Sequence, residues 1–387
     1  RVLLMAGCLV TPPLALSACA DDEIKRPAVT DPVMPDLGPE AAEGTISLSQ
    51  METYTPFTAG TGAHSYRIPA MVTAADGSLL VFCEARYNSW MDKSYTDIVV
   101  RRSTDNGKTW SEQTNLTGSA NGGGYAFMDP TPVADRTTGR IFVFCCRWVK
   151  SDADATKTRA YMISSSDNGA TWSDPADVTD QVIVPGCFSS GFGPGSGIQI
   201  SRGRRAGRLI LPSRQYNGSA SKGFAVYSDD HGTTWKVSSE VLGGESQIAE
   251  CGEDRLTVNI RKGTDRYSSF SKDGGQTWTA AAKDGGLPSF ESGCHASVCS
   301  GGGILRGGMV HHGSRLPHRD MDIRKQQASG TGSLLFFVLI CLSRGRARRG
   351  RGCSCRDIRP WPFRRAERPP WSRAGRAPQD TPRRAPP

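Results

Sequence analysis

The 387-residue sequence lacks the patterns that mark metal-binding, disulfide-framework, nucleotide-binding and membrane-spanning proteins. Its twelve cysteines form no Cys-x-x-Cys ladder, and no zinc-ligand spacing occurs. The apolar run at residues 334–342 is only nine residues long, too short to cross a bilayer. The glycine-rich segment 193–199 is not followed by Lys-Ser or Lys-Thr, which excludes a phosphate cradle. We therefore predict no cofactor and no metal site.

Net positive charge is confined to the C-terminal part of the chain. From Cys299 onward, 18 Arg and one Lys face five acidic residues, so the preceding part is net negative although the whole chain carries +9. Such an extension can bind nucleic acid, but Pro and Trp interrupt its basic runs and no nucleic-acid-binding module is present. Its Arg, Gly and Pro content is typical of out-of-frame translation of a GC-rich gene. We expect residues 299–387 to be a frameshifted, disordered tail, and we predict no nucleic-acid partner.

The N-terminal residues have the features of an export signal. A short apolar stretch ends in Leu16-Ser-Ala-Cys19, which resembles a bacterial lipoprotein cleavage box whose Cys is lipidated. The alternative is an ordinary secretory signal with an incidental Cys. We predict a lipoprotein signal over residues 1–19 and a Pro-containing flexible tether over residues 20–45. The protein is then exported to the cell surface or periplasm, with Cys19 anchored in the outer membrane.

One eight-residue pattern, Ser-x-Asp-x-Gly-x-Thr-Trp, occurs four times, and each copy follows a short strand-like run. This placement predicts a turn between two strands, in which the Asp accepts backbone N–H groups, the Gly supplies positive φ and the Trp is buried as a strand restarts. The spacings between successive Asp residues are 62, 63 and 43 residues, and the last fits one four-stranded propeller blade. We therefore expect an all-β fold, a β-propeller. The four copies begin at Ser103, Ser165, Ser228 and Ser271.

Tyr66-Arg67-Ile68-Pro69, followed by these repeats, resembles the bacterial exo-α-sialidase (neuraminidase) family, in which the repeats are called Asp boxes. The resemblance runs from about residue 65 to residue 298. It implies a six-bladed propeller over residues 46–298, which is incomplete at its C-terminal end because the resemblance stops there.

The resemblance also implies how a sialic acid carboxylate is held. A planar guanidinium can bind a carboxylate in a bidentate manner, which a compact ammonium does less well. Arg67 matches the first arginine of the family's carboxylate clamp, and Arg261 matches the second. Lys262 and Arg266 are the competitors of Arg261. The family's third clamp arginine cannot be matched to one residue, because no family motif surrounds any of the arginines in the C-terminal part of the chain.

The anomeric carboxylate explains why the family uses a tyrosine nucleophile, since a carboxylate nucleophile would meet like-charge repulsion. A tyrosine needs a base to take its proton. Glu245 matches that base, with Glu250 as competitor, but no Tyr follows Tyr267 in the sequence.

The general acid should be an Asp on a loop after the first arginine. Asp92 fits this position, whereas Asp97 begins the following strand-like run. Arg86 matches a supplementary substrate arginine, and a salt bridge to Glu84 or to a nearby Asp is its equally weighted alternative. Asp129 is expected near the pocket for the N-acyl group of the sugar.

These residues imply retaining hydrolysis of terminal sialic acids, with sialylated glycoproteins, glycolipids or oligosaccharides as substrates. The alternative is a non-catalytic, glycan-binding propeller lipoprotein. A third class, a glycosidase using two carboxylates on a neutral sugar, gives no reason for clustered arginines. The sialidase hypothesis requires Arg67, Asp92, Glu245 and Arg261 to meet at one end of the propeller.

Overall fold

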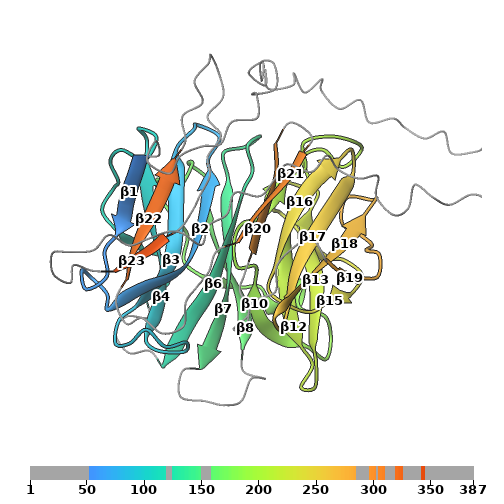
Figure 1. Cartoon of the computed structure of the whole chain (residues 1–387), viewed down its shortest axis with the longest axis horizontal. Helices are drawn as coiled ribbons and strands as arrows, with labels where there is room; N and C mark the ends of the chain where they lie inside the picture. The colour runs from blue at the N-terminus through green and yellow to red at the C-terminus, as the bar shows by residue number, and fades with distance from the viewer. Residues whose placement is uncertain are drawn as a thin grey trace, which may run out of the picture.

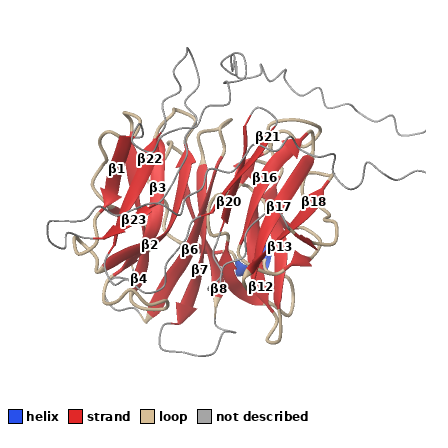
Figure 2. Ribbon diagram, viewed as in Figure 1, coloured by secondary structure: helices blue, strands red, loops and turns tan. Residues whose placement is uncertain are grey.

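The computed structural model describes residues 52–118, 124–149 and 158–284, together with four strand segments, 296–301, 304–309, 319–325 and 341–344. Within these residues the fold is almost entirely β, with 23 strands and one short helix, α1 (Thr179–Val182) (Figure 2). The predicted all-β class is confirmed. No helix in the described part of the chain is long and apolar enough to span a membrane.

The strands form antiparallel blades that stand side by side around a common axis (Figure 1). Blade 1 comprises β2 (Ser65–Thr73), β3 (Leu79–Arg86), β4 (Thr96–Ser103) and β5 (Thr114–Asn115). Blade 2 comprises β6 (Tyr125–Ala134), β7 (Ile141–Val149), β8 (Arg159–Ser165) and β9 (Ala176–Asp177). Blade 3 comprises β10 (Phe188–Phe192), β11 (Ile198–Gln199), β12 (Leu209–Tyr216), β13 (Ser221–Ser228), β14 (Lys236–Val237) and β15 (Val241–Leu242). Blade 4 comprises β16 (Ser246–Gly252), β17 (Arg255–Lys262), β18 (Asp265–Ser271) and β19 (Ala282–Lys283).

Two smaller sheets follow these four blades. In one, β20 (Ala296–Gly301) pairs with β21 (Ile304–Met309). In the other, β22 (Arg319–Lys325) lies between the N-terminal strand β1 (Glu52–Phe57) and β23 (Cys341–Arg344), so early and late strands share a sheet (Figure 1). A short parallel pairing of β4 with β6 joins blades 1 and 2 into one eight-stranded sheet, so the described strands form five hydrogen-bonded sheets. The propeller is incomplete, because the two smaller sheets have only two and three strands.

The expected end of the propeller at Val298 differs from the structure, since that residue lies inside β20 and three more strands follow. We expected no strands there because the alternation of apolar and polar residues is absent. Backbone pairing to an open strand edge, such as that of β1, does not need this alternation. The predicted lipoprotein signal, the whole of the predicted tether and the remainder of the tail lie outside the described residues.

All four Asp boxes connect the third strand of a blade to its short fourth strand, as predicted. In each, the Ser Oγ accepts the N–H of the box Gly at 2.8 Å and donates to the Asp carboxylate at 2.8 Å. The same carboxylate accepts the backbone N–H of the box Thr at 2.9–3.0 Å. The box Gly has a φ between 79° and 88° in all four copies. Only Trp235 is fully buried among the box tryptophans, and it alone directly precedes a strand.

The core lies between the blades. Leu80 and Phe82 of blade 1 pack with Ile141 and Val143 of blade 2, and equivalent clusters join blades 2 and 3 and blades 3 and 4. The Asp boxes add to these interfaces, since a Cβ atom placed on Gly232 would collide with the ring of Phe142 in the preceding blade. Repetition of the box therefore repeats an interface between blades.

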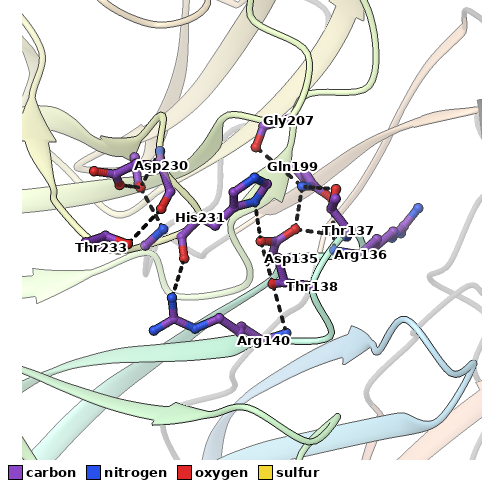
Figure 3. Close-up of polar contacts among 12 residues, drawn as sticks. Asp135, Arg136, Thr137, Thr138, Arg140, Gln199, Gly207, Asp230, His231 and Thr233 are labelled. Carbon is purple, nitrogen blue, oxygen red and sulfur yellow. Dashed lines mark hydrogen bonds and ion pairs between the residues drawn. The ribbon is translucent and has the colours of Figure 1, made fainter. Parts of the chain in front are cut away.

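A polar network reinforces the interface between blades 2 and 3 (Figure 3). The buried carboxylate of Asp135 accepts hydrogen bonds from Thr138 Oγ1 at 2.7 Å and Gln199 Nε2 at 2.7 Å, and it lies 2.7 Å from His231 Nδ1. Arg140 donates to the backbone carbonyl of His231 at 2.8 Å. This Asp box is thus held by side chains of the blade before it.

Candidate functional site

The first strands of blades 1, 2 and 3 carry irregularities at corresponding places. The ladder register shifts between Arg67 and Ala70 in β2, between Met128 and Thr131 in β6, and between Ser189 and Gly191 in β10. Positive φ values occur within these shifts, 51° at Ile68, 57° at Asp129 and 138° at Gly191. Bulges redirect side chains and often occur beside active sites.

Arg86, at the end of β3, is fully buried and organises the loop that follows it. Its Nε donates to Glu84 Oε2 at 2.8 Å, its Nη2 lies 2.8 Å from Asp92 Oδ1, and its Nη1 donates to the Trp90 carbonyl at 2.6 Å. The salt bridge to Glu84, offered as the alternative for Arg86, is present. The Asp92 side chain is 71% exposed to solvent, and its ion pair with the buried Arg86 fixes its position.

Arg67 lies beside this loop. Its Nη1 donates to the same Trp90 carbonyl at 3.3 Å. The bulge at Ile68 directly follows Arg67 in β2, so the backbone changes direction next to the Arg67 side chain. Arg67 and Arg86 therefore hold one backbone oxygen between two guanidinium groups.

Asp129 connects blades 1, 2 and 3. Its backbone N–H donates to Glu84 Oε1 at 2.9 Å, and its Oδ2 accepts from Arg214 Nη2 at 2.6 Å. Burial raises the pKa of Asp129 to about 7; Arg214 acts against this rise, and the charges of Glu84, Glu245 and Asp92 add to it. The electrostatic influence of these three carboxylates indicates that the acidic groups of blades 1, 2 and 4 lie near one another.

Arg214, on β12, is a site residue that sequence reasoning missed. No repeated motif surrounds it, and the only sequence signal is a cation placed directly after the apolar run 209–212. Gly191 makes room for the ion pair, because a Cβ atom at that position would collide with the Asp129 carboxylate and the Arg214 guanidinium.

Glu245 and Arg261 form an ion pair in blade 4, with 2.8 Å between Oε2 and Nη1. The antiparallel ladder explains their separation in sequence, since Ser246 of β16 is opposite Ile260 of β17 and Glu245 O accepts the N–H of Arg261 at 2.8 Å. Both side chains are partly exposed, 23% for Glu245 and 33% for Arg261.

The segment between β10 and β11 contacts both blade 1 and blade 4. Ser196 Oγ donates to the Met71 carbonyl of blade 1 at 2.6 Å, and Gln247 of blade 4 donates to the Ser196 carbonyl at 2.5 Å. Ser246 N donates to the Gly193 carbonyl at 2.8 Å. This glycine-rich segment thereby fixes blade 4, and with it Glu245, relative to blade 1.

The competing residues make other contacts. Glu250 accepts hydrogen bonds from Ser201 N at 3.0 Å and Ser201 Oγ at 2.7 Å, which agrees with a structural role. The buried Asp97 accepts from Thr117 Oγ1 at 2.6 Å. Arg266 is buried and donates to a side-chain amide of β17, and Lys262 is exposed. The six predicted residues are instead linked by contacts or close charge interactions: Arg67, Arg86, Asp92, Asp129, Glu245 and Arg261.

The described residues contain no group of three or more His, Cys, Asp or Glu side chains placed to hold a metal ion. The site instead combines carboxylates with guanidinium groups. Such a site can bind an anion through its arginines and exchange a proton through its carboxylates.

Comparison with known proteins identifies the family. The pattern described as BNR repeat-like domain matches residues 120–312, and that described as BNR/Asp-box repeat matches residues 101–112. The sialidase of Micromonospora viridifaciens is 32% identical over 297 residues, covering 72% of this chain and 44% of that protein. The chain belongs to the sialidase family with Asp-box repeats. A sialidase of Bacteroides fragilis is also 32% identical, over 61% of the chain and 47% of its own length.

Solved sialidase structures share the propeller fold. The Hadza microbial sialidase Hz136 superposes with a TM-score of 0.61 at 26% identity, covering 74% of this chain and 61% of its own. A leech intramolecular trans-sialidase gives a TM-score of 0.57 at 20% identity, covering 75% of this chain and 64% of its own, and is similar in fold. This sialidase-family chain spans about half the length of the curated relatives it matches. The family match extends to residue 312, beyond the limit of residue 298 expected from the motifs.

Proposed function

We propose that the protein is an exo-α-sialidase that releases terminal sialic acids from glycoproteins, glycolipids or oligosaccharides with retention of configuration. The observation that carries this proposal is the grouping of arginines and carboxylates on blades 1, 2 and 4. Arg67 and Arg86 share the Trp90 carbonyl, and Arg86 also pairs with Asp92. Glu245, which pairs with Arg261, is close enough for its charge to influence the pKa of Asp129. A neutral sugar would not require several arginines at one site.

Arg67 and Arg261 are assigned to the substrate carboxylate. Arg261 is already oriented by Glu245, and its side chain is one-third exposed. Arg86 is fully buried and its donors contact Glu84, Asp92 and Trp90, which supports a role in positioning Asp92. Asp129 is assigned to the N-acyl pocket, as the family resemblance implies.

Asp92 is assigned as the acid that protonates the leaving oxygen. Glu245 would take the proton of a tyrosine, whose oxygen attacks the anomeric carbon and forms a glycosyl-enzyme that water hydrolyses. No Tyr follows Tyr267 in this sequence. We therefore expect the 387-residue chain to bind sialosides and to turn them over slowly, if at all.

A titration with methyl α-sialoside, followed by calorimetry, tests the assignment of the carboxylate clamp. Arg67→Ala should weaken binding by about tenfold or more, because charge-assisted hydrogen bonds are lost. Arg67→Lys should recover only part of the affinity, since a point charge replaces a planar fork. Lys236→Ala, which removes an exposed cation from blade 3, should leave the affinity unchanged. Equal effects of the Arg67 and Lys236 substitutions would refute the assignment.

We also propose that the protein is exported and anchored to the outer membrane through Cys19. The support comes from the sequence alone: Leu16-Ser-Ala-Cys19 and the Pro-containing segment after it. Both lie outside the residues that the structure describes. Mass spectrometry of the N-terminal peptide checks this proposal, and an unmodified Cys19 would contradict it.

A further inference from the structure

Two large hydrophobic side chains are exposed in the part of the chain that the structure describes, Trp90 at 38% and Met91 at 57%. They are consecutive, and Asp92 follows them directly. A single exposed apolar residue is ordinary, but an adjacent pair beside the candidate acid offers apolar surface where a ligand would lie.

The backbone that carries this pair is held from several directions. The Trp90 carbonyl accepts hydrogen bonds from Arg86 and Arg67, and the Met91 N–H donates to Ser89 Oγ at 2.9 Å. These contacts use backbone atoms of the pair and leave both side chains exposed. The pair is thus presented by an ordered loop.

The other side of the loop is tied to blade 2. Lys93 Nζ lies 3.9 Å from the centroid of the Trp148 ring at the end of β7, a cation–π contact. The loop therefore bridges blades 1 and 2, and Met91 and Asp92 lie between the bound carbonyl of Trp90 and the attached Lys93.

The chemistry of the acid places the leaving group in this region. An acid that protonates a glycosidic oxygen must reach that oxygen, and the departing sugar is bonded to the same atom. The sugar must therefore lie against residues next to Asp92. A pyranose has a C–H face that packs on an indole, while its hydroxyl groups remain in water.

We propose that Trp90 and Met91 form a platform for the sugar next to sialic acid, so that the protein prefers sialosides with a pyranose leaving group over those with a small one. This inference rests on the proposed sialidase function.

Comparison of two ligands tests the platform without requiring turnover. Methyl α-sialoside carries only a methyl group beyond sialic acid, whereas 3′-sialyllactose carries the pyranose. We expect the 387-residue chain to bind 3′-sialyllactose roughly fivefold more tightly, with quenching of tryptophan fluorescence. Trp90→Ala should abolish this difference, Trp90→Phe should retain part of it, and Met91→Ala should reduce it.

The same titrations separate the two proposals. If neither ligand binds to the folded protein, the sialidase function itself fails. If both ligands bind the parent chain with equal affinity, or if Trp90→Ala weakens methyl α-sialoside as much as 3′-sialyllactose, the platform is refuted and sialic acid recognition stands. Thermal unfolding of each variant shows that the exposed substitutions leave the fold intact.

Discussion

Among single residues, Asp129 has the environment that departs furthest from that of an ordinary surface carboxyl. It is buried next to Arg214, and its pKa is raised from 3.8 to about 7 by burial. The folded protein therefore binds more protons than the unfolded chain between about pH 4 and pH 7. The stability that Asp129 contributes is present below about pH 4 and is lost as the pH rises through about 7.

Asp129→Asn should remove this dependence, because the amide does not titrate and can still accept from Arg214. We expect the melting temperature of the variant, relative to the parent chain, to increase steadily between pH 4 and pH 7. Thermal unfolding in a buffer series measures this. Asp76→Asn, at a surface ion pair with Arg102, is the matched control and should not show the same trend. Parallel curves for the parent chain and Asp129→Asn would contradict the prediction.

The Asp-box aspartates show how far residue-level reasoning from sequence reaches. Their role as acceptors was predictable because donor and acceptor lie within eight residues, and the hydrogen bonds from Thr109 and Thr171 lower the pKa of Asp105 and Asp167 to about 2. Arg214 was not predictable, because its partner Asp129 lies 85 positions away on another blade.

At the scale of elements, a repeated arginine contact joins successive blades. Arg102 of blade 1 donates to the Asn168 carbonyl at 3.0 Å, Arg140 of blade 2 to the His231 carbonyl, and Arg208 of blade 3 to the Gly274 carbonyl at 2.8 Å. Each acceptor is the residue between Asp and Gly of the next Asp box. The Asp box thus also accepts a hydrogen bond from the preceding blade, a role that its sequence alone did not indicate.

Arg208 and Arg140 allow the contribution of this contact to stability to be compared between a buried and an exposed arginine. Arg208 is buried and also pairs with Asp229 at 2.8 Å, whereas the Arg140 contact is exposed. Arg208→Met should lower the free energy of unfolding by about 3 kcal/mol. The substitution leaves the Asp229 carboxylate without its ion-pair partner and the Gly274 carbonyl without its hydrogen-bond donor. Arg140→Met should cost no more than ~1 kcal/mol. Urea unfolding measures both, and equal losses would argue against the difference in burial as the cause.

The arrangement of strands also explains which residue pairs of the candidate site could be predicted from the sequence. Glu245 and Arg261 were identified through family resemblance, and the β16–β17 ladder places them opposite each other. The bridge from Glu84 to both Arg86 and the Asp129 backbone depends on the packing of β3 against the bulge in β6. Such a bridge requires the arrangement of blades, which no local pattern encodes.

At the scale of the whole molecule, the strands near the two ends of the described chain meet in one sheet. β1 pairs with β22, and pairing of this kind brings the start and the end of a propeller together. The family match nevertheless ends at residue 312, and the Arg-rich composition begins near the same region. The resemblance to the family therefore ends, and the Arg-rich composition begins, before the last strands of the propeller.

This change in composition leads to a prediction about the gene and its product. Resequencing the DNA that encodes residues 298–312 should reveal a single-base change, and the alternative frame should encode a further Asp box, an arginine and a tyrosine. The corrected protein should hydrolyse a fluorogenic sialoside, because Glu245 would gain a tyrosine to activate. The 387-residue chain should bind the same compound with little or no release of the fluorophore. Robust turnover by that chain would show that a nucleophile other than a C-terminal tyrosine operates, and two alternative frames without tyrosine would favour a glycan-binding propeller.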